Sequence, residues 1–158
     1  MLSVDAMTAQ DDYRLMIRDH VAPALRELGF KGSGQSYVFP SETHWVSLWF
    51  QKSAYSDAHR IKFTVHLLVI GKNEWEAIRR GNELAPERPR RFWGAPARSW
   101  SVSYRPRPKE VPGGWMQIWW ELYAGQPVGP LADLVLRTIK NEALPRIEEY
   151  MAWSSAES

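Results

Sequence analysis

The sequence has no cysteine among its 158 residues. This absence excludes a disulfide framework, a thiolate nucleophile and a thiolate metal site. Long apolar runs are also lacking, since the longest, residues 67–70, is far shorter than the roughly 20 residues that span a bilayer. The N-terminus has an early acid and no apolar core of signal-peptide length. We therefore expect a soluble, cytoplasmic protein of the bacterial type, with no membrane partner, no cofactor and no metal.

A large net charge is missing as well, because the formal net charge is only +2. The charges are nevertheless uneven: residues 79–109 hold nine basic and two acidic side chains, a surplus of seven positive charges. Such a segment could bind nucleic acid or a phosphate-bearing ligand, with Arg90 and Arg91 as anion contacts. The alternative is a solvated loop whose arginines pair with acidic neighbours.

A long helix is predicted over residues 8–28, where apolar side chains recur at helical spacing. Thr8 and Asp11 resemble a capping box at its start, although Asp replaces the usual Glu or Gln. Pro23 lacks an amide hydrogen and predicts a kink within the helix. Gly29 suits the position just beyond its end.

A second long helix is predicted to begin at Pro130, because proline suits the first helical position. Pro145 predicts that this helix is kinked or divided. The stripe predicted to be buried consists of seven apolar residues: Leu131, Leu134, Val135, Ile139, Leu144, Ile147 and Met151.

The segments between these helices alternate apolar and polar residues with the period of a β-strand. Three of them predict an antiparallel meander and two predict later strands: residues 36–39, 43–51 and 61–70, then 100–104 and 115–123. Residues 31–35 are predicted to be a turn and residues 73–80 a short helix capped by Asn73. Residues 82–97 are rich in proline and predict an irregular but ordered excursion.

This order of elements predicts an α+β fold. We expect an antiparallel sheet of about five strands, with the long N- and C-terminal helices packed on one face. The length fits a single domain over residues 1–158, with residues 1–7 and 154–158 frayed.

Several short motifs follow one another at a distinctive spacing. They are the helix end LRELGFK at residues 25–31, the aromatic strand YVF at 37–39, the segment LWFQKS at 48–53, a strand beginning near Phe63, and the pair Trp119–Trp120. In these motifs the sequence resembles the bacterial family catalogued as domain of unknown function 4304, over about two-thirds of the chain. It departs at His66, where the family pattern Phe-x-Val-Asn-Leu leads us to expect Asn. The family has no established activity, so the resemblance implies no catalytic residues.

Nine tryptophans are many for a chain of this length, and several share the strand face that is predicted to point away from the helices. We name this surface the tryptophan face; it contains Trp45, Trp49, Trp115 and Trp119, with His66 among them. A large exposed apolar surface marks a binding site unless something covers it. Residues 82–97, with Phe92 and Trp93, could fold over it. A partner protein or a second copy could cover it instead, or a ligand such as a nucleic-acid base could stack there.

The sequence therefore predicts a non-enzymatic binding or protein-interaction module. Nucleic-acid or phosphate-ligand binding through residues 79–109 is the alternative, and a hydrolase that pairs His66 with a carboxylate such as Glu121 is a third hypothesis. No catalytic residue is assigned. The candidate ligand-binding residues are Trp45, Trp49, Lys52, His66, Arg90, Arg91 and Trp119.

Overall fold

The computed structural model describes residues 7–89, 98–101, 103–104, 116–117 and 119–156. Its helices are α1 (Ala9–Met16), the π-helical turn η2 (Ile17–Val21), α2 (Ala22–Glu27), α3 (Lys72–Gly81), α4 (Val128–Thr138), the π-helical turn η3 (Ile139–Ala143) and α5 (Leu144–Ala156). Its strands are β1 (Lys31–Ser33), β2 (Ser36–Val38), β3 (His44–Lys52), β4 (Arg60–Gly71), β5 (Arg98–Ser101), β6 (Ser103–Tyr104), β7 (Met116–Gln117) and β8 (Trp120–Tyr123).

The main sheet is antiparallel and has six strands in the order β1-β2-β3-β4-β5, with β8 also paired to β4. Strands β5 and β8 share one edge of β4: β5 pairs with residues 66–69 and β8 with residues 60–63. Strands β6 and β7 form a separate two-stranded pair. The predicted meander is confirmed as β2-β3-β4.

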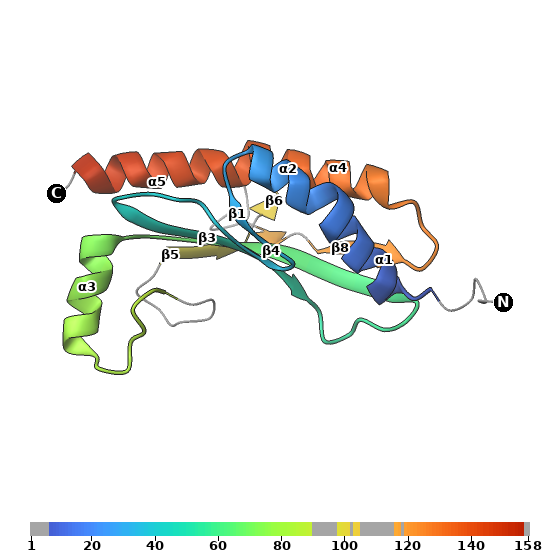
Figure 1. Ribbon diagram of the computed structural model, residues 1–158, viewed down its shortest axis with the longest axis horizontal. Helices are drawn as coiled ribbons and strands as arrows, with labels where there is room; N and C mark the ends of the chain where they lie inside the picture. The colour runs from blue at the N-terminus through green and yellow to red at the C-terminus, as the bar shows by residue number, and fades with distance from the viewer. Residues whose placement is uncertain (1–6, 90–97, 102, 105–115, 118, 157–158) are drawn as a thin grey trace.

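The helices α1, α2, α4 and α5 lie on one face of the sheet, and α3 lies beyond its other side (Figure 1). The main core fills the space between those four helices and the sheet. Its strand residues are the ones that alternation predicts, and all are almost fully buried: Val46, Leu48, Phe50, Ile61, Phe63, Val65, Leu67 and Val69. The predicted α+β fold is therefore confirmed, and none of the described helices is long and apolar enough to cross a membrane.

The N-terminal helical segment begins and ends as predicted. The Thr8 hydroxyl accepts the amide hydrogen of Asp11, and the Asp11 carboxylate accepts that of Thr8. Gly29 follows the helix with a φ of +105°, a conformation that glycine adopts readily. The amide of Phe30 then donates to the carbonyl of Leu25, which closes a Schellman motif.

Each predicted proline kink is a π-helical turn that ends just before the proline. Ala22 donates its amide hydrogen to the carbonyl of Ile17, five residues back, and Pro23 follows. In the C-terminal segment, Leu144 donates to Ile139 in the same way, and Pro145 follows. In the wider turn the backbone hydrogen bond spans five residues instead of four, next to a proline that has no amide hydrogen to donate.

The C-terminal segment differs from its prediction in two places. Its helix begins at Val128 rather than Pro130, because the first turn has unpaired amides and tolerates proline at its third position. Leu134 is 43% exposed and not buried. At about 100° per residue, it lies outside the stripe formed by Leu131 and Val135.

Two short segments also differ from the sequence-based expectation. Residues 31–35 are not a turn throughout, because Lys31–Ser33 form β1 and the hairpin turns only at Gly34 and Gln35. Asn73 does not cap α3, because β4 runs directly into the helix and Gly71 occupies the cap position.

Other expectations are not tested. Residues 90–97 lie outside the described residues, as do residues 1–6 and 157–158, while α5 continues to Ala156. The frayed ends and the single-domain assignment therefore stay predictions.

Candidate functional site

The tryptophan face is covered by the chain itself over the part that the structure describes. Trp49 is only 3% exposed and belongs to a second, smaller cluster with Leu68, Ile70, Trp75 and Ala85, against which Trp45 and Ile78 also pack. The indole N–H of Trp75 donates to the carbonyls of Pro86 (3.1 Å) and Glu87 (3.2 Å). Helix α3, which none of the three possibilities included, and residues 82–89 therefore cover the part of this face around Trp49. The possibility that residues 82–97 cover the face with Phe92 and Trp93 is tested only in part, because these two residues and Trp115 lie outside the described residues.

Part of the basic segment is already engaged within the chain. The guanidinium of Arg88 lies 5.1 Å from the Trp45 ring centre, and Lys72 lies 4.5 Å from the same ring. Arg79 pairs with Glu76 at 2.8 Å. Arg90 and Arg91 lie outside the described residues, so their role as anion contacts stays a prediction.

His66 lies in the middle of β4 on the tryptophan face. Its ring stacks on Trp49, with 5.2 Å between ring centres, and its Nε2 shares a hydrogen bond with the Gln51 side-chain oxygen. Burial lowers the pKa of His66 below its ordinary value. The neutral imidazole is therefore favoured.

The structure does not bring His66 and Glu121 together. Glu121 pairs in register with Lys62, four residues along β4 from His66 and therefore about 13 Å away. Its carboxylate contacts Arg60 at 3.6 Å and accepts the Tyr123 hydroxyl at 2.9 Å. The hypothesis of a hydrolase built on this pair is wrong.

Lys52 and Trp119 do not join Trp45 and Trp49. Lys52 ends β3 on the helix-covered face of the sheet, with its ammonium 5.9 Å from the Tyr13 ring centre. Trp119 is half-buried immediately before β8 and is not part of the second cluster, as far as the structure describes it.

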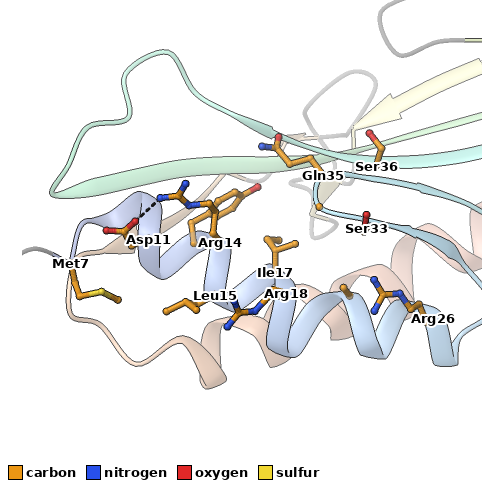
Figure 2. A pocket seen from close by; sticks show the side chains of 13 residues that line it. Met7, Asp11, Arg14, Leu15, Ile17, Arg18, Arg26, Ser33, Gln35 and Ser36 are labelled. Carbon is orange, nitrogen blue, oxygen red and sulfur yellow. Dashed lines mark hydrogen bonds and ion pairs between the residues drawn. The ribbon is translucent and has the colours of Figure 1, made fainter.

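An open groove of about 1010 Å³ lies between the N-terminal helical segment and the β1–β2 hairpin. We name it the helix–hairpin groove; it is lined by Met7, Asp11, Tyr13, Arg14, Leu15, Ile17, Arg18, Ala22, Arg26, Ser33, Gly34, Gln35 and Ser36. Figure 2 shows Arg14, Arg18 and Arg26 on the helical wall, and Ser33, Gln35 and Ser36 on the hairpin across from it. The groove thus has a basic wall that faces a neutral polar wall.

The three arginines of this wall recur at intervals of four and eight residues and extend over about 18 Å of helix. Arg14 pairs with Asp11, and Arg18 pairs with Asp19 at 2.8 Å. The side chains of Arg14 and Arg18 are 73% and 71% exposed. Arg26 donates to the carbonyl of Gly32 at 3.1 Å. Because this acceptor is a neutral carbonyl, the contact does not neutralise the positive charge of Arg26.

This groove was not predicted from the sequence. The spacing of Arg14, Arg18 and Arg26 was visible as a basic stripe beside the buried stripe of the same helix. The opposite wall was not visible, because the hairpin residues 33–36 reach the helix only through the pairing of β1 with β2.

The described residues contain no group of three or more His, Asp or Glu side chains placed to hold a metal ion. Comparisons with curated proteins and with solved structures give no match. A family model does match residues 21–149, most of the chain, and its description is "Domain of unknown function (DUF4304)". The groove is only partly within the match, since Arg26 and residues 33–36 are inside it while Arg14 and Arg18 precede it. The chain belongs to the DUF4304 family.

Proposed function

We propose that this protein is a non-enzymatic binding module that holds an anionic ligand in the helix–hairpin groove. The observation that carries the proposal is the row of Arg14, Arg18 and Arg26 along one wall of an open groove. Guanidinium groups are the preferred partners of carboxylate and phosphate because each offers several donors in a fixed plane.

The present partners of these arginines support exchange with a ligand. The pairs of Arg14 with Asp11 and of Arg18 with Asp19 are exposed to solvent. Exposed ion pairs contribute only about 0–1 kcal/mol. An incoming anion can therefore use free donors of both arginines, or replace their carboxylate partners, at little cost.

The hairpin wall supports the proposal in a second way. Ser33, Gln35 and Ser36 offer hydroxyl and amide groups, which donate to an anion without repelling it. At the tip, a side chain added to Gly34 would meet nothing within 4 Å, so a ligand has room to approach the backbone there.

The competing proposal is binding through residues 79–109. Two of its described arginines are engaged within the chain, since Arg88 lies over the Trp45 ring and Arg79 pairs with Glu76. The Arg79 side chain is only 34% exposed, against 73% for Arg14 and 71% for Arg18, so the groove is the better-supported site.

The test is nuclear magnetic resonance of isotope-labelled protein titrated with inorganic phosphate at low ionic strength. Amide signals of residues 14–18, 26 and 33–36 should shift together. Arg18→Ala should weaken the phosphate affinity about fivefold, the effect of roughly 1 kcal/mol. Arg137→Ala, which removes an exposed arginine of α4 outside the groove, is the matched control and should leave the affinity unchanged.

Two outcomes would overturn the proposal. Shifts concentrated at Arg79, Arg80 and Arg88 would move the anion site to the basic segment. Equal weakening by Arg18→Ala and Arg137→Ala would mean that phosphate responds only to net charge.

A further inference from the structure

One buried polar group belongs to the groove. The Tyr13 hydroxyl is almost completely buried, since the residue is 2% exposed, and it has no hydrogen-bond partner among the described residues. The residue lines the groove, although its hydroxyl oxygen is closed off from solvent in the free protein. An unpaired buried hydroxyl destabilises the fold, whereas phenylalanine of the same shape would avoid that destabilisation.

The surroundings of Tyr13 favour an oxyanion as the missing partner. The ammonium of Lys52 lies 5.9 Å from its ring centre, and Arg14 is its neighbour along the helix. Gln35 of the hairpin stands across the groove from Arg14 (Figure 2). Burial, and to a smaller extent the nearby Tyr37, raises the pKa of Tyr13, so this phenol stays protonated and keeps its hydrogen available to donate.

Apart from Asp11 and Tyr13, the rest of the helical wall is apolar. Leu15 is half-buried and Met7 is 46% exposed, whereas Ile17 and Ala22, which also line the groove, belong to the buried core. A fully hydrated ion such as phosphate makes no use of this surface. A ligand that carries an apolar body behind its charged head would bury it.

We infer that the groove takes an amphipathic organic anion, whose carboxylate or phosphate head displaces the side chains over the Tyr13 hydroxyl and accepts a hydrogen bond from it while its apolar body lies on Leu15 and Met7. The inference rests on the proposed function, because the arginines supply the charge that attracts the head. Tyr13 then distinguishes an oxygen acceptor from other head groups.

Tyr37 offers a matched control. It is also a buried tyrosine, 1% exposed, and its hydroxyl also has no hydrogen-bond partner among the described residues. It does not line the groove, although it lies near Tyr13 and near Arg26 of the helical wall. Replacing either residue by phenylalanine removes the same atom from an equally buried site.

The experiment measures the affinities of octyl phosphate, octanoate and octanol by calorimetric titration, below the concentrations at which they form micelles. Both anions should bind at least tenfold more tightly than octanol. Tyr13→Phe should weaken both anions about ten- to a hundredfold and leave octanol unchanged, as expected for a lost hydrogen bond to a charged acceptor. Tyr37→Phe should leave all three affinities unchanged.

Thermal unfolding of the ligand-free variants shows whether a loss of affinity comes from a destabilised fold. Both phenylalanine variants should melt at the wild-type temperature or above it, because each removes an unpaired buried hydroxyl. The larger loss between the two anions identifies whether the natural head is a phosphate or a carboxylate.

The inference fails if Tyr13→Phe binds both anions like the wild type, or if Tyr37→Phe weakens them equally. In either case the proposed function stands as long as Arg18→Ala still weakens inorganic phosphate. Octanol that binds as tightly as the anions would overturn the oxyanion head and leave only an apolar site.

Discussion

The two faces of the main sheet are both buried near its centre, but they are covered very differently. Four helices, α1, α2, α4 and α5, pack on one face and enclose the main core. The other face has a small cluster around Trp49 and Trp75, closed by α3 and residues 82–89. The large core holds the fold together, and the small one fixes a single helix and the segment that follows it.

The burial pattern along strand β4 reflects this difference in how the two faces are covered. Residues 60–63 alternate between half-buried and buried side chains, as in a sheet covered on one face. Residues 67–70 are all at most 1% exposed, because α3 covers their second face. A change from alternating to continuous hydrophobicity within one strand therefore marks where the second layer begins.

The largest effect should come from neighbouring residues of β3 that point to opposite faces. Phe50→Ala, in the main core, should lower the free energy of unfolding by about 3–5 kcal/mol. Trp49→Ala should cost less, because the smaller cluster can open without unfolding the main core. Urea denaturation of both variants measures the difference, and equal losses would contradict the separation into two cores.

A smaller effect is expected at the hydrogen bonds that close the second cluster. Trp75→Phe keeps a large ring but removes the donor to Pro86 and Glu87, at a cost of about 0.5–1.5 kcal/mol. Hydrogen exchange should become faster in α3 and residues 82–89, while β3 keeps its protection. Faster exchange throughout β3 would mean that the two faces unfold as one unit.

The smallest effect should distinguish one histidine on each face. His44 packs against Tyr150 of α5, and His66 stacks on Trp49; burial lowers the pKa of both below the ordinary 6.5. For His44, the charge of Glu74 partly opposes this shift. The unfolded chain then binds more protons than the folded one, so stability is complete above pH 6.5 and decreases as the pH falls towards the folded-state values.

The variant His66→Gln tests which face of the sheet causes the pH dependence of the stability. The variant should lose less stability than the wild type between pH 7.5 and pH 5.5, and His44→Gln should show a separate reduction of the same sign. Thermal unfolding at both pH values gives the comparison. Stability that rises on acidification of the wild type would contradict the direction of both pKa shifts.

Local signals predicted much of the main core and little of the groove. The capping box at Thr8, the stop at Gly29 and the alternation of β3 and β4 depend on neighbours in sequence, so pattern alone was sufficient. Leu134 was assigned to the buried stripe of α4, although it lies outside the direction shared by Leu131 and Val135. Lys52 was predicted as an anion contact, but the parity of β3 puts it on the helix-covered face of the sheet.

The candidate site was harder to predict than the core because its two walls belong to different elements. The arginine spacing on the helix can be seen in the sequence, but Gln35 and Ser36 become part of a site only when the hairpin folds beside that helix. Tyr13 was not among the residues predicted to matter, since a sequence does not reveal whether a buried hydroxyl has a partner. Sites made by tertiary contacts between short elements escape motif-based prediction for this reason.

The two π-helical turns have a consequence for how the helical sequences can change. In both helical segments, buried residues recur every four positions: Ala9, Tyr13, Ile17, Val21 and Leu25 in the first, and Leu131, Val135, Ile139, Ala143 and Ile147 in the second. In a regular α-helix such a repeat would drift about 40° around the axis at each step. The single π-helical turn in each segment offsets most of this rotation, so the buried residues before and after it stay on the side of the helix that faces the sheet. Deleting one residue there would leave composition almost untouched and yet rotate every later side chain away from the sheet.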